Sequence, residues 1–195
     1  MPETHAADIH TADLDTGESI PTSAFDTSSL SAERRDILET LAAHRQFLRT
    51  TASGLTDAQA AHPSTVSALS VGGLIKHVAF TESGWADFIV FGPDGLGGSD
   101  ESSYAAHEDS FRMNDDETLT QLLDRYDEVA RRTDALVATL ADLDAAHPLP
   151  EAPWFPPGAT RSARRVFLHI IAETAQHAGH ADIIREAIDG SRTMG

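Results

Sequence analysis

Apolar side chains, with one threonine among them, recur every three or four positions between residues 119 and 143. They are Leu119, Leu122, Tyr126, Val129, Thr133, Leu136, Leu140 and Leu143. This spacing is the period of an α-helix and places all eight side chains on one face. Asn114 and Glu117, just ahead of the run, have the spacing of a capping box. The sequence therefore predicts a long amphipathic helix, whose apolar face has to pack against other elements.

Three further segments have the same helical spacing. They cover residues 32–54, 70–91 and 162–189, with Ser31 as the expected N-cap of the first and Gly190 as the expected end of the last. We find no alternation typical of strands and no internal repeat. The sequence predicts an all-α fold, a four-helix bundle with long crossover-type connections.

Two of the connections are unusually long. Residues 92–111 contain four glycines and one proline, and residues 145–159 contain five prolines, so neither is expected to be regular helix throughout. Connections of this length are uncommon in a compact domain unless they cover a site. We expect both to form walls of a pocket.

Composition limits the range of functions. The chain has 31 acidic and 14 basic residues, and a net charge of -17 argues against nucleic acid or an anionic membrane as a partner. The sequence contains no cysteine and no apolar run long enough for a membrane span. We expect a flexible acidic tail over residues 1–30, one domain over 31–190, a short tail over 191–195, and a cytoplasmic location.

Metal-ligating side chains line one face of the last predicted helix. His169, Glu173, His177 and His180 follow at intervals of four, four and three residues, and His77 lies on the inward face of the second helix. Imidazole and carboxylate groups suit zinc, nickel or iron. The alternative is structural: an inward histidine packs in the core, and Glu173 pairs with Arg164 or Arg165. For His44 we favour the structural alternative.

Two sequence runs resemble the DinB-like (YfiT-like) superfamily. The first is LSVGGLIKHVAFTESGW, residues 69–85, and the second is ETAQHAGHADIIR, residues 173–185. Residues 43–48 and 54–60 are similar to the first helix of that family and the turn after it. The resemblance covers roughly residues 30–190 and implies a four-helix bundle.

The resemblance also implies a ligand set. In the superfamily a histidine of the second helix and two residues four apart on the last helix bind a metal, and here these positions hold His77, Glu173 and His177. The usual last-helix pair is two histidines; a glutamate in the first place resembles the branch of mycothiol-dependent maleylpyruvate isomerase and mycothiol S-transferases. His180 stands where many relatives have glutamine, which suggests a supporting or substrate-facing role, and His169 is expected to pack beside the ligands.

The function implied by this resemblance is a metal-dependent S-transferase or isomerase that uses mycothiol, with the metal activating the thiolate. The expected partners are a small-molecule thiol and an electrophile, and the expected metal is zinc, with nickel or iron as alternatives. A homodimer is possible for such a chain. A metal-dependent hydrolase and a non-catalytic metal-binding stress-response bundle remain open, because fold alone does not decide activity.

Overall fold

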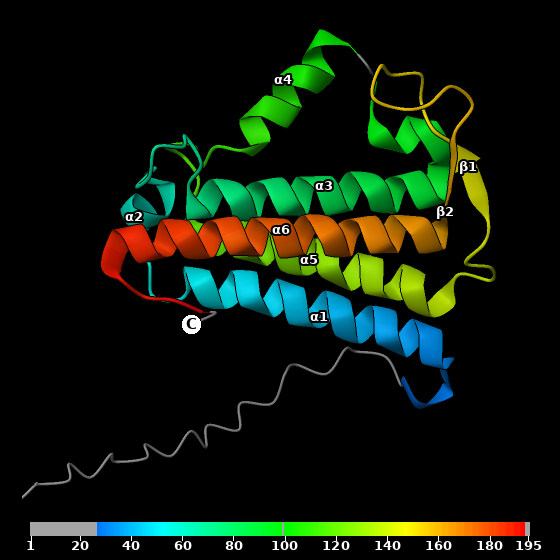
Figure 1. Ribbon diagram of the computed structural model, residues 1–195, viewed down its shortest axis with the longest axis horizontal. Coiled ribbons are helices and arrows are strands. Elements are labelled where there is room, and N and C mark those ends of the chain that lie inside the picture. The colour runs from blue at the N-terminus through cyan, green and yellow to red at the C-terminus, as the bar shows by residue number, and fades with distance from the viewer. Residues whose placement is uncertain (1–26, 99, 194–195) are drawn as a thin grey trace, which may run out of the picture.

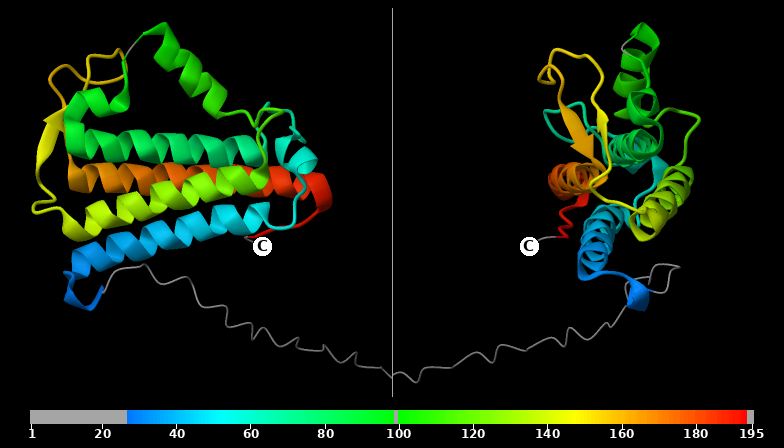
Figure 2. Two further views of the ribbon diagram at one scale, coloured as in Figure 1. Left: turned by 180° about the vertical axis from the view of Figure 1, so that it is seen from behind. Right: turned by 90° about the vertical axis from the view of Figure 1, so that its right-hand side faces the viewer.

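The computed structural model describes residues 27–98 and 100–193, and four long helices dominate this part of the chain (Figure 1). They are α1 (Ala32–Ala52), α3 (Val71–Phe91), α5 (Leu119–Thr139) and α6 (Ala163–Asp189). Helix α6 packs against α1 and α3, and α3 also packs against α5. The view along the bundle in Figure 2 shows the four helices around a common core. The predicted all-α bundle is confirmed.

The helix ends follow from local capping. The hydroxyls of Ser31, Ser70 and Ser162 each accept a hydrogen bond from the backbone N–H three residues later. Gly190 ends α6 with a left-handed φ of 78°, a conformation that costs glycine little. These three long helices begin and end within two residues of their predicted bounds.

Both ends of α5 differ from the prediction. The helix ends at Thr139 with Leu140 as its C-cap, so Leu140 and Leu143 of the predicted run lie beyond it. The Glu117 carboxylate accepts a hydrogen bond from the Asn114 N–H at 2.8 Å, as a capping box requires, but this contact only closes a turn ahead of the helix. The cap is Thr118, which together with Gln121 forms the complete capping box. The prediction placed the start four residues too early because both pairs have the same spacing.

The connections contain more regular structure than predicted. Residues 92–111 include a 3-10 turn, η2 (Gly92–Leu96), and an α-helix, α4 (Glu101–Ser110), which Asp100 caps. A short helix, α2 (Asp57–Ala61), follows α1, and residues 27–29 form the 3-10 turn η1 (Thr27–Ser29). The strands β1 (Ala146–Pro148) and β2 (Thr160–Ser162) pair antiparallel on either side of the proline-rich loop. Three-residue strands are too short for an alternation pattern to reveal them.

The core consists of two apolar clusters along the bundle axis. One is formed around Leu48, Leu74 and Leu122, the other around Leu41, Phe88 and Phe167. On each long helix a buried polar residue stands between the two clusters; these residues are Arg45, Glu82, Thr133 and Thr174. A polar layer therefore crosses the middle of the core.

Most of the predicted N-terminal tail, residues 1–26, lies outside the described residues. At the other end, the N–H of Thr193 donates to the side chain of Asp182 at 2.7 Å. None of the helices in the described part of the chain is both long and apolar enough to cross a membrane.

Candidate metal centre

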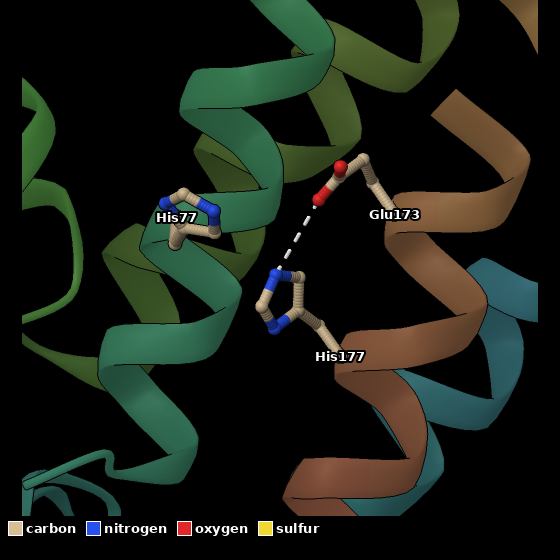
Figure 3. Close-up of side chains that lie close together, drawn as sticks. All are labelled: His77, Glu173 and His177. Atoms are coloured by element: carbon tan, nitrogen blue, oxygen red, sulfur yellow. Dashed lines mark ion pairs between the residues drawn. The ribbon is translucent and has the colours of Figure 1, made fainter. Parts of the chain in front are cut away.

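Three of the predicted ligands lie together between α3 and α6. His77, Glu173 and His177 each offer a ligand atom, and these atoms all lie within 4.8 Å of one another. In Figure 3 a ring nitrogen of His77 faces the other two side chains across the space between the helices. Among the described residues Glu173 forms no ion pair with Arg164 or Arg165: its carboxylate contacts His169 and His177, and Arg164 pairs with Glu33 and Asp144.

Hydrogen bonds around His77 imply which of its ring nitrogens is free. The Ser110 hydroxyl donates to the carbonyl of His107 at 2.6 Å, so its oxygen accepts from Nδ1 of His77 at 2.9 Å. Nε2 is then unprotonated and has only a long contact of 3.4 Å to the Thr81 hydroxyl. Such a hydrogen bond fixes the tautomer and orients a metal-binding imidazole.

The phenyl ring of Phe111 covers His77. The two rings stack with centroids 3.6 Å apart at an angle of 18°, and the His77 residue is only 4% exposed. Helix α4 and the residue after it thus supply both the hydrogen bond and the cover for this imidazole. The sequence predicts no role for Ser110, Phe111 or the nearby His107, because the glycines and the proline in residues 92–111 indicate an irregular connection. The available signal was the helical spacing of His107 and Ser110 after an Asp cap.

On α6 the Glu173 carboxylate lies between two imidazoles. One oxygen lies 3.5 Å from Nε2 of His177, one turn later, and the other lies 3.8 Å from Nε2 of His169, one turn earlier. Nδ1 of His180 lies 3.5 Å from Nδ1 of His177. The structure therefore places His169 and His180 directly beside the three clustered residues. His44, by contrast, has its ring contact with Phe47 and is outside the cluster.

Burial lowers the pKa of His77, His169 and His177 and so favours their neutral forms. It lowers the pKa of His77 to about 3, with smaller contributions from the neighbouring His177 and His107. Burial and His180 lower the pKa of His177, and burial and Arg161 lower that of His169. Neutral imidazoles with free lone pairs, next to one carboxylate, are a donor set that fits a divalent ion such as zinc.

These shifts predict that the metal-free protein loses stability in mild acid. Because folding lowers the pKa of His77, the unfolded chain binds more protons between about pH 3 and pH 6.5, and the free energy of unfolding falls as the pH is lowered through this window. One proton contributes up to about 1.4 kcal/mol per pH unit. Urea unfolding with chelator at several pH values measures this slope, and His77→Gln should flatten it. An equal slope in both proteins would contradict the assignment.

Gly73 allows Phe111 to reach His77. A Cβ at this position would lie 2.1 Å from the carbonyl oxygen of Phe111, whereas a Cβ at Gly84 on the same helix would meet nothing within 4 Å. We expect Gly73→Ala to displace residue 111 and to lower the free energy of unfolding by about 1–3 kcal/mol. Gly84→Ala should raise it by up to about 1 kcal/mol. Thermal unfolding of both variants tests this. Equal melting temperatures would show that the space between Gly73 and the Phe111 carbonyl can accept a Cβ.

Two comparisons with known proteins found a match. A sequence model of the family described as Mycothiol-S-transferase matches residues 36–190. A conserved protein from Enterococcus faecalis of solved structure is similar over 80% of this chain and 97% of its own, with a TM-score of 0.54 and 17% identity, and this likeness shows the fold alone. No curated protein matches the chain.

Proposed function

The chain belongs to the mycothiol-S-transferase family, a DinB-like family, and from this premise we propose that it joins the sulfur of mycothiol to a small electrophile at a divalent-metal centre. The residues proposed as ligands are His77, Glu173 and His177. The observation that carries the proposal is their convergence within 4.8 Å, inside the region that the family model matches. A cytoplasmic location and zinc as the native metal are part of the same proposal.

The donor set and the composition of the chain both suit this chemistry. Three protein ligands leave room on a divalent ion for a further ligand, and such an ion lowers the pKa of a thiol that it binds. The sequence has no cysteine, so the sulfur has to come from an external thiol. In the transfer the thiol gives up its proton and its sulfur forms a bond to an electrophilic carbon. At a halogenated carbon the halide departs with its electron pair; at an unsaturated carbon the π bond breaks and the adjacent carbon takes a proton.

The protein residues around the centre hold the proposed ligands in place. Ser110 and Phe111 fix the ring of His77, while His169 lies against the oxygen of Glu173 that does not face His177. We propose that His169 and His180 support the ligands and do not themselves bind the ion. This follows the general pattern in which neighbouring groups orient metal-binding side chains.

Metal analysis and a transfer assay test the proposal. Protein purified without a metal-binding tag should contain about one divalent ion per chain, and it should conjugate mycothiol to a halogenated or unsaturated electrophile. Treatment with a chelator should abolish conjugation, and adding back zinc, nickel or iron one at a time should identify the ion that restores it. Metal-dependent hydrolysis of esters without conjugation would contradict the transferase assignment, as would the absence of any metal.

A further inference from the structure

Arg161, in strand β2, has a half-buried guanidinium group that forms no ion pair with any acid in the part of the chain that the structure describes. Its Nη1 atom is buried and has no hydrogen-bond acceptor among the described residues. The group lies over two aromatic rings, 4.7 Å from the centroid of Trp85 and 5.5 Å from that of Phe155. Burial and the nearby Arg165 lower its pKa, because no carboxylate offsets the loss of water.

Arg45 shows how this chain otherwise buries a guanidinium. Its Nη2 and Nη1 atoms contact Glu82 at 2.5 Å and Asp134 at 2.8 Å. Burial alone lowers its pKa, but the two carboxylates more than offset that effect and the pKa is raised. For Arg161, by contrast, no ion pair with any of the described acids offsets the partial burial, although the sequence has 31 acidic residues. An anionic group that pairs with this guanidinium on binding would replace the water that burial removes.

The position of Arg161 links it to the proposed metal centre. The hairpin fixes its backbone, since Arg161 pairs with His147 across β1 and β2, directly before α6 begins (Figure 1). Trp85, under the guanidinium, also meets the ring of His169, with centroids 4.7 Å apart at 83°. His169 in turn contacts Glu173. Arg161, Trp85 and His169 thus form a continuous contact path from the hairpin to the ligand cluster.

We propose that Arg161 binds an anionic group, a carboxylate in the simplest case, of the electrophile that accepts the sulfur. This proposal rests on the proposed transferase function and names the substrate class. Trp85 follows His77 by eight residues on α3, about 12 Å along the helix axis. The acceptor should therefore carry its anionic group about 12 Å from its electrophilic carbon. The hydrocarbon part between the two would lie near the rings of Trp85 and Phe155.

A matched series of acceptors tests this. N-acryloyl amino acids of increasing chain length carry a carboxylate, and their methyl esters do not. The thiol sulfur bonds to the β-carbon, the C=C π bond breaks, and the α-carbon takes the proton. We expect Arg161→Gln to lower kcat/KM for the acids about tenfold or more, through KM, and to leave the esters within about twofold. Arg161→Lys should recover part of the loss, and the exposed neighbour Arg165→Gln should have little effect.

Binding measured without turnover separates this proposal from the transferase function. N-propionyl amino acids cannot react, so calorimetry reports their binding alone. The wild-type protein should bind these acids about tenfold more tightly than their esters, and Arg161→Gln should abolish the difference while keeping its metal content. Wild-type protein that binds acids and esters equally would overturn the role of Arg161. Anion binding without transfer to any acceptor would overturn the transferase function alone.

Discussion

At the proposed metal centre, replacing Glu173 with glutamine is expected to abolish metal binding and, with it, the proposed thiol transfer. The substitution keeps the size of the side chain but replaces its anionic ligand by a neutral amide between His169 and His177. Loss of a supporting contact alone typically costs ten- to hundred-fold in metal affinity, so loss of a ligand charge should cost more than about a hundredfold. Competition with a fluorescent zinc chelator measures the affinity, and conjugation of mycothiol to an electrophile measures the activity.

His44→Ala is the matched control for this experiment. His44 is a histidine of the same bundle, partly exposed and in contact with Phe47, and it lies outside the ligand cluster. Metal affinity and transfer should be unchanged in this variant, and circular dichroism should show the same helix content in both. Equal loss of metal in the two variants would mean that general destabilisation is being measured. Full metal retention in Glu173→Gln would exclude Glu173 as a ligand.

The four long helices could be predicted because the spacing of apolar residues within each one indicates which face is buried. Every third or fourth residue of α5 is apolar, and the serine caps of α1, α3 and α6 stand directly ahead of the periodic runs. These are local properties, so no knowledge of the partner helices was needed. The short helix α4 has no such apolar face: nine of its ten residues are exposed or only partly buried, and only Ser110 is buried.

In the candidate site, too, contacts within one helix could be predicted from the sequence, whereas contacts between distant segments could not. Glu173 and His177 lie four residues apart on one helix, and helical geometry alone brings them together. That His77 joins them depends on how α3 packs against α6; its place on the inward face of the second predicted helix made it a candidate, and the family resemblance implied the full set of three. The cover of His77 by Phe111 and the unpaired state of Arg161 could not be foreseen. Both depend on contacts between segments far apart in the sequence, through Gly73 in one case and the hairpin in the other.

Breaking the buried ion pair between Arg45 and Glu82, in the polar layer of the core, is expected to lower the stability strongly. Arg45 donates to both oxygens of Glu82, from Nη2 at 2.5 Å and from Nε at 3.3 Å, and the two residues are 4% and 1% exposed. Glu82→Leu leaves Arg45 buried with Asp134 as its remaining acidic partner. We expect the free energy of unfolding to fall by about 3–5 kcal/mol. For a domain of this size that corresponds to a melting temperature lower by about 6–20 °C.

A double substitution distinguishes a broken ion pair from lost packing. Arg45→Met combined with Glu82→Leu removes both charges and fills the space with apolar atoms next to two apolar clusters, so it should recover most of the lost stability. Asp134→Asn, which changes the more exposed acid of the network, should cost less than Glu82→Leu. Urea unfolding of the wild type, the single variants Arg45→Met and Glu82→Leu, and the double variant gives the coupling energy between Arg45 and Glu82. A double variant as unstable as the sum of its two single variants would mean that the charges do not interact, and that the polar layer owes its stability to packing around Thr133 and Thr174.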